Sequence, residues 1–127
     1  MTGIQHHELA AGRWWTLSIF EQLGNVGSEI SRAIRWTSRN PDLAKGALYR
    51  ALELLDLTLA DPVHRKSKAR LREIARTREV VVDYFEGANR YGTNALSLQK
   101  YFDGYALAAR RAKVIRDGAE PVARVAT

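Results

Sequence analysis

The chain of 127 residues has the length of one domain, which can bury its own core without a disulfide or a metal. Cysteine is absent, which excludes disulfide frameworks, thiolate metal sites and cysteine nucleophiles and agrees with a reducing cytoplasm. The formal net charge of +6 favours anionic partners such as nucleic acid, although the same excess also serves solubility. Neither a secretory signal pattern nor an apolar run of bilayer length occurs, so we expect a cytoplasmic protein without membrane association.

Prolines at positions 41, 62 and 121 fall where helical periodicity stops and divide the chain into four helical blocks. The first predicted helix runs from about Trp14 to Ser38. Its stripe of alternating three- and four-residue spacing consists of Leu17, Phe20, Gly24, Gly27, Ser31 and Ile34. Because glycine destabilises a helix interior, Gly24 and Gly27 predict the close approach of a neighbouring helix. Asn40 and Pro41 then read as the N-cap and first residue of the next helix.

The second helix is predicted from about Pro41 to Ala60. Its core stripe consists of Leu48, Leu52, Leu55 and Leu59. The third is predicted from residue 63 or 67 to 85, with a stripe of Leu71, Ile74, Arg78, Val81 and Phe85. The fourth is predicted from 95 to 116, with a stripe of Leu98, Phe102, Tyr105, Ala109 and Ala112. We therefore predict an all-α, antiparallel up-down four-helix bundle over residues 14–116, with an N-terminal extension (1–13) and a flexible C-terminal tail (117–127).

No arrangement of residues typical of an active site is apparent. His6, His7 and His64 lack a second ligand at helical spacing, so no metal site is predicted. A phosphate-binding glycine loop and a nucleophile elbow are both missing from the sequence. We expect a protein that is not an enzyme and uses no cofactor.

Arg78 falls on the apolar stripe of the third predicted helix. A guanidinium stays charged in a protein, so burial there requires a carboxylate partner. We predict a buried ion pair that fixes helix register, with Glu53 or Asp56 as the partner and Asp83 as a further candidate. The alternative is that Arg78 lines a channel or a polyanion site.

Basic residues are concentrated where the third helix begins. Between Val63 and Arg78 only Glu73 is acidic, against Arg65, Lys66, Lys68, Arg70, Arg72, Arg76 and Arg78. Cations at a helix start oppose the helix dipole, so a local structural role does not explain them. We predict that Arg65, Lys66, Lys68, Arg72 and Arg76 bind nucleic-acid phosphates without reading bases. The competing hypothesis is a structural or protein-interaction bundle whose basic residues only solubilise it.

Apolar side chains outside the core stripes suggest an assembly of several copies. Leu54 and Leu57 widen the apolar face of the second helix, and Tyr101 adds a second stripe to the fourth. Trp14 and Trp15 precede the first helix, and tryptophan is enriched at interfaces. We predict that these five residues form a homo-oligomer interface.

Four segments together resemble a known family: 24–34 (GNVGSEISRAI), 50–58 (RALELLDLT), 71–80 (LREIARTREV) and 83–85 (DYF). The sequence is similar to the four-helix-bundle proteins encoded in 23S ribosomal-RNA intervening sequences and to the accessory (Avd-like) proteins of diversity-generating retroelements. The similarity is greatest to a bacterial subgroup of unassigned function and covers residues 14–112. The resemblance implies a homopentameric barrel of four-helix bundles. For the retroelement relatives it also implies a basic surface that binds nucleic acid and partners a reverse transcriptase.

Overall fold

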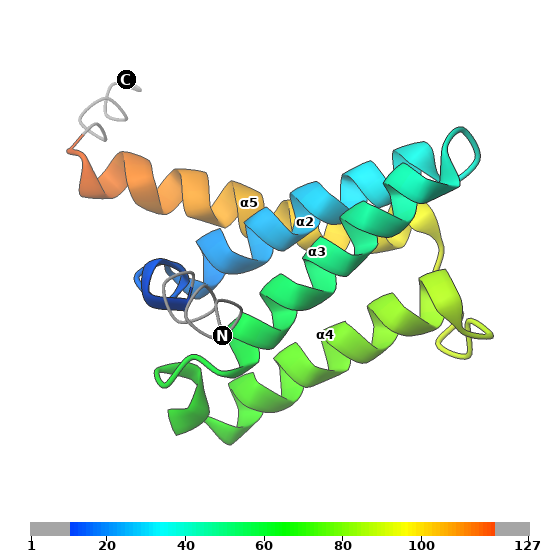
Figure 1. Ribbon diagram of the computed structural model, residues 1–127. Helices are drawn as coiled ribbons and strands as arrows, with labels where there is room; N and C mark the ends of the chain where they lie inside the picture. The colour runs from blue at the N-terminus through cyan, green and yellow to red at the C-terminus, as the bar shows by residue number, and fades with distance from the viewer. Residues whose placement is uncertain (1–10, 119–127) are drawn as a thin grey trace, which may run out of the picture.

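The computed structural model describes residues 11–118, and in this range the chain forms helices and turns without any strand, which confirms the all-α class. The elements are α2 (Ile19–Trp36), α3 (Pro41–Leu59), the short 3₁₀ helix η1 (His64–Lys66), α4 (Lys68–Glu86) and α5 (Ala95–Arg116) (Figure 1). A helical turn at 11–14 precedes α2. Most of the predicted extension and tail lies outside the described residues. Within the described range, no helix has the length and apolar character needed to cross a bilayer.

Side-chain caps set the helix starts. α2 begins at Ile19 rather than at the predicted Trp14, because Ser18 and Glu21 form a capping box in which each side chain bonds the other's backbone N–H. The Asn40 side chain accepts from the Leu43 N–H, and Pro41 occupies the first turn of α3. Ser67 and Asn94 cap α4 and α5 in the same way. The predicted bounds of these last three helices hold to within one residue, if the later of the two predicted starts is taken for α4.

The core surrounds α2, which packs against α3 on one side and α5 on the other (Figure 1). Its buried apolar residues are Leu23, Val26, Ile30 and Ala33, so the core stripe lies beside the predicted one. Phe20, predicted to be in the core, is 41% exposed. The predicted stripe is one edge of the buried surface: Gly27 is buried and Ile34 is partly buried, but α2 has two neighbours and buries a wider arc.

Gly24 and Gly27 lie where α2 meets α5. A Cβ atom at Gly27 would be 2.5 Å from the Phe102 Cβ, and one at Gly24 would be 3.1 Å from the Ala106 Cα. Only glycine permits backbones this close. The predicted close approach at these two positions is therefore confirmed.

Of the long helices, α4 packs least closely against the rest of the fold. It lies beside α3 and η1, and only Ile74, Thr77 and Val81 of its 19 residues are buried. Between α4 and α5, contact is made by long side chains, described below. α4 therefore depends on few apolar contacts for its position.

The two tryptophans before α2 make contacts within the chain, and their predicted place at an oligomer interface stays a prediction. Trp14 is 9% exposed and its indole N–H donates to the Thr58 hydroxyl at 2.9 Å. The Trp15 indole donates to the Leu57 carbonyl at 2.8 Å. Leu54 and Leu57 are partly buried against the same core. Residues Thr16–Ser18, which were predicted to lie inside a helix, form a turn. This turn folds the tryptophans back onto the end of α3.

Candidate nucleic-acid interface

Six exposed cations follow one another through η1 and the first half of α4, and we call them the basic segment: Arg65, Lys66, Lys68, Arg70, Arg72 and Arg76. In the part of the chain that the structure describes, none of them has a carboxylate oxygen within 4.0 Å. The first turn of α4 contains no acidic residue either. The segment therefore combines uncompensated cations with the positive end of a helix dipole, which is a strong field for an anion.

Two members of the basic segment are held in place by local contacts. Arg65 donates to the Leu59 carbonyl at 3.3 Å. The guanidinium of Arg76 lies over the ring of Tyr91, with 5.3 Å between the guanidinium carbon and the ring centroid. Such a cation–π contact orients the group without neutralising its charge.

A buried polar cluster positions the start of the basic segment. Asp61 is 2% exposed, and its Oδ1 accepts from the Val63 N–H at 3.0 Å while its backbone carbonyl accepts from the N–H of His64 at 3.1 Å. Its Oδ2 accepts from the Gln22 side chain at 2.9 Å. Gln22 also donates to the Trp14 carbonyl at 3.0 Å. The turn leading into η1 is thus joined to α2 through side chains that water does not reach.

His64 completes this cluster. It is 2% exposed, and its Nε2 lies 2.6 Å from the Gln22 Oε1, which requires Nε2 to carry the proton and donate. Nδ1 is buried without a hydrogen-bond partner among the described residues. Burial lowers the pKa of His64 below its ordinary value of 6.5, Asp61 opposes this shift, and Arg70 adds to it. The neutral ring therefore belongs to the folded state, with a structural role in the cluster.

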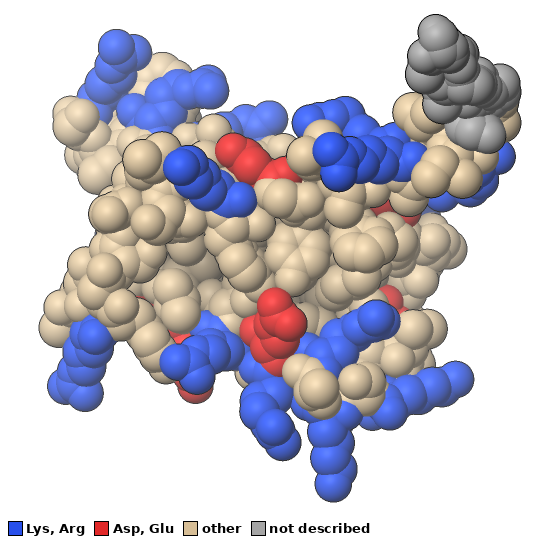
Figure 2. Space-filling view, turned by 180° about the vertical axis from the view of Figure 1, so that it is seen from behind, with Lys and Arg blue, Asp and Glu red and all other residues tan. Residues whose placement is uncertain are grey.

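Basic side chains frame one face of the molecule. Figure 2 shows Lys and Arg side chains projecting from its upper and lower edges, with a mostly uncharged band between them. Because the view is turned about the vertical axis, α4 stays at the lower edge. The basic segment is therefore one border of a band that carries little charge of its own.

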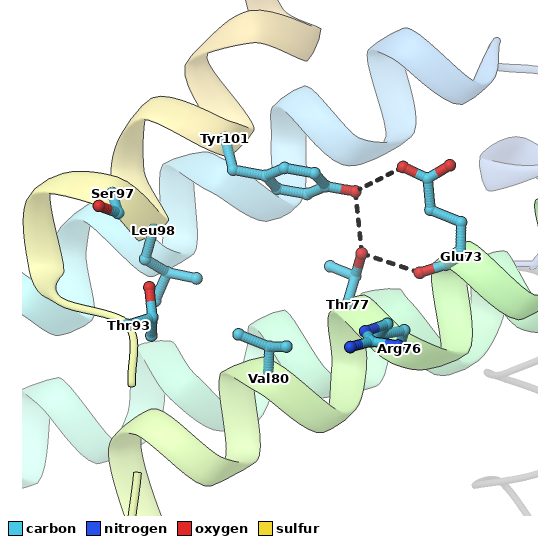
Figure 3. Close-up of a pocket in the computed structure, with 8 residues that line it drawn as sticks. All are labelled: Glu73, Arg76, Thr77, Val80, Thr93, Ser97, Leu98 and Tyr101. Carbon is cyan, nitrogen blue, oxygen red and sulfur yellow. Dashed lines mark hydrogen bonds between the residues drawn. The ribbon is translucent and has the colours of Figure 1, made fainter. Parts of the chain in front are cut away.

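A cavity of about 290 Å³ opens between α4 and α5. Its walls are Glu73, Arg76, Thr77, Val80, Thr93, Ser97, Leu98 and Tyr101 (Figure 3). The Tyr101 hydroxyl points at Glu73 and Thr77, and its ring extends along one side of the space (Figure 3). Tyr101, predicted at an oligomer interface, thus lies on a wall of this cavity.

Glu73 is held by two phenols. Its Oε2 accepts from the Tyr101 and Tyr105 hydroxyls, both at 3.1 Å, and the two hydroxyls lie 3.3 Å apart. Burial raises the pKa of both tyrosines, so both remain protonated donors at neutral pH. The side chains that join α4 to α5 are therefore polar and centred on one carboxylate.

Arg78 pairs with Asp56, but not in the core. Its Nε lies 2.7 Å from Asp56 Oδ1 and its Nη2 lies 3.3 Å from Oδ2. The side chains are 35% and 58% exposed, and Glu53 is exposed with no contact to Arg78 recorded. The predicted burial was wrong because Thr77, the preceding residue, is 7% exposed and occupies the seam. This surface pair crosses from α4 to α3.

The buried cluster and the cavity were not predicted from the sequence. Asp61 followed by Pro62 is typical of an Asx-type turn, which was a usable signal for an ordered turn here. Nothing local connects this turn with Gln22, 39 residues away in the sequence from Asp61. Among the described residues, no group of three His, Asp or Glu side chains is placed to hold a metal ion.

Comparisons with protein-family models, with curated proteins and with solved structures gave no match.

Proposed function

We propose that the protein is a non-catalytic, homo-oligomeric four-helix bundle that binds nucleic acid through the phosphate backbone. The observation that carries the proposal is the basic segment. It presents six exposed cations at the start of α4, without carboxylate partners among the described residues. These cations oppose the dipole of their own helix, and phosphate binding would explain why they lie there.

The arrangement of the segment suits a strand of phosphates. The helical turns of α4 space Lys68, Arg72 and Arg76 four residues apart, so their side chains follow one face of the helix. The buried cluster around Asp61 fixes the preceding turn, which presents Arg65 and Lys66 outward. Phosphate contacts carry no sequence information, so we expect binding through these six cations to be independent of base sequence.

The oligomeric part of the proposal rests on the resemblance described above and on exposed apolar surface. The resemblance suggests that five copies of an up-down bundle assemble into a homopentamer. It also suggests a reverse transcriptase as the class of protein partner. Leu107, Val114 and Ile115 on the last turns of α5 are 41%, 47% and 67% exposed. Apolar side chains grouped in this way favour a protein contact.

Salt titration of binding tests the proposal. Single-stranded RNA and duplex DNA of random sequence should bind at low salt, and the logarithm of the binding constant should fall linearly with the logarithm of salt concentration. Replacing Arg65, Lys68 and Arg72 with glutamine should reduce the magnitude of the slope on duplex DNA by about 2 to 3. The matched control replaces Arg35, Arg39 and Lys45, which are equally exposed but lie away from the segment.

The outcomes separate the proposal from its competitor. Equal loss of binding in both triple variants would mean that only net charge matters. No retention of any polynucleotide at low salt would refute nucleic-acid binding and would favour a structural or protein-interaction bundle. Light scattering of the unmodified chain, with and without RNA, measures the oligomeric state in the same buffers.

A further inference from the structure

Glu73 is an acidic residue surrounded in sequence by the basic segment, and its charge is held in a fixed place. Its Oε2 accepts from Tyr101 and Tyr105, so the carboxylate borders the cavity between α4 and α5. No cationic group of the described residues lies within 4.0 Å of it. Oε1 has no hydrogen-bond partner among those residues.

A carboxylate at this place repels phosphate, so a ligand that contacts Glu73 would do so through hydrogen-bond donors. Ionised carboxylates accept hydrogen bonds and never donate them. In nucleic acid, the Watson–Crick edges of the bases supply N–H donors, and single strands can turn these edges toward a protein. Glu73 is therefore suited to a base rather than to the backbone.

The cavity has the walls that a base requires. Tyr101 supplies an aromatic ring, and Val80 and Leu98 supply apolar surface at the opposite end (Figure 3). Thr93 and Ser97 line the same end with hydroxyls. A volume of about 290 Å³ is at the lower limit of small-molecule sites, so it suits one ring system.

Arg76 gives the cavity a place for the rest of the nucleotide. It lines the cavity and also belongs to the basic segment, and while it stacks on Tyr91 it has no carboxylate oxygen within 4.0 Å among the described residues. A base beside Glu73 would therefore have a cation at hand for its phosphate. The cavity and the basic segment form one continuous surface.

We propose that the cavity between α4 and α5 receives one unpaired base, with guanine preferred, and that Glu73 reads its Watson–Crick edge. Guanine presents N1–H and the N2 amino group side by side, so both can donate to the Oε1 that Tyr101 and Tyr105 leave free. Adenine and cytosine present only the amino group on this edge, and uracil only one N–H. This proposal rests on the proposed function, to which it adds a base-reading site that the six cations lack.

The test compares decauridylate with the same strand carrying one central guanosine, adenosine or cytidine. Fluorescence anisotropy should give an affinity about tenfold or more higher for the guanosine strand, since a good carboxylate–base pair discriminates by this order. Glu73→Gln should abolish the difference while leaving affinity for decauridylate unchanged or slightly higher. Tyr101→Phe, which removes one hydroxyl that holds Glu73, should reduce it.

Glu86→Gln is the matched control, because it removes the same charge from an exposed position on the same helix. It should keep the guanosine preference intact. Circular dichroism and thermal unfolding establish that each variant is folded. Titration of the protein with free guanosine, adenosine, cytidine and uridine monophosphates separates a base in a strand from a free nucleotide.

The possible results distinguish the base site from the proposed function. Strand binding with no guanosine preference, or with a preference that survives Glu73→Gln, overturns the base site and leaves the proposed function standing. Guanosine monophosphate binding that Glu73→Gln abolishes, without strand binding, refutes the proposed function and supports the cavity as a guanine site. Failure of every strand and every nucleotide to bind overturns both.

Discussion

Adding one methyl group at Gly27 tests the helix crossing on which the core depends. In Gly27→Ala the new Cβ would lie 2.5 Å from the Phe102 Cβ and 3.3 Å from its Cγ. The backbone fixes both Cβ positions, so no rotamer of Phe102 relieves the shorter contact. α2 and α5 must therefore move apart, and Phe102, which has no exposed surface, loses part of its packing.

The expected magnitude is a difference between two effects. Alanine is favoured over glycine in a helix interior by about 0.5 to 1 kcal/mol. Overpacking a well-packed core destabilises by about 1 to 3 kcal/mol. Gly27→Ala should therefore lower the free energy of unfolding by about 1 kcal/mol. Gly104→Ala should raise it by about 0.5 to 1 kcal/mol, because its Cβ meets nothing within 4 Å.

Urea and thermal unfolding of the two variants measure this difference directly. About 1 kcal/mol corresponds to a change in Tm of about 4 °C for a domain of this size. Gly46→Ala is a second control, since its Cβ would lie 3.7 Å from an Arg50 side-chain nitrogen, an ordinary contact. If Gly27→Ala were as stable as Gly104→Ala, α2 and α5 would not approach as closely in solution as described.

Three further predictions concern polar side chains. The unfolded chain binds the His64 proton more tightly than the folded one, so stability should fall as pH drops below 6.5, and His64→Gln should weaken this dependence in urea titrations from pH 8 to 5. A double-mutant cycle with Arg78→Met and Asp56→Asn should give a coupling below about 1 kcal/mol, because the pair is partly exposed; a coupling of several kcal/mol would restore the buried pair. Trp14→Phe should destabilise by about 1 kcal/mol through loss of its hydrogen bond, without changing the light-scattering mass. A change in the light-scattering mass of Trp14→Phe or Trp15→Phe would support the predicted place of these residues at an oligomer interface.

Local sequence signals were enough to predict the all-α class and the bounds of three long helices. Asn40 with Pro41, Ser67 and Asn94 mark three helix starts, because capping depends on residues within one turn. Ser18 and Glu21 carry the same kind of signal for α2, and it was overlooked in favour of the apolar tryptophans that precede it. Gly27 identified the close crossing, since few other reasons place glycine inside a helix.

The candidate site could be predicted only in part. The basic segment is continuous in sequence, so its exposure at the start of α4 follows from the pattern. In the sequence, Glu73 is noticeable only as the one acidic residue among these cations. Its contacts with Tyr101 and Tyr105 join residues 28 and 32 positions apart, and helical periodicity does not determine which helices face each other across such distances. The predicted burial of Arg78 was wrong for a related reason. A rotation of the helix by one residue decides whether Arg78 or Thr77 faces the core.

The sparse burial of α4 has a consequence for how the molecule opens. Hydrogen exchange in a native protein proceeds through the least costly partial unfolding, and helices with few buried apolar contacts open first. α2, α3 and the turn at Asp61 are joined by the core and by the buried cluster, whereas α4 packs less closely and fully buries only Ile74 and Val81 of its apolar residues. α4 is thus the natural unit of subglobal unfolding, and its amides should exchange well before those of α2. The helix that carries four cations of the basic segment is thus the one that can separate from the core while the rest of the fold stays intact.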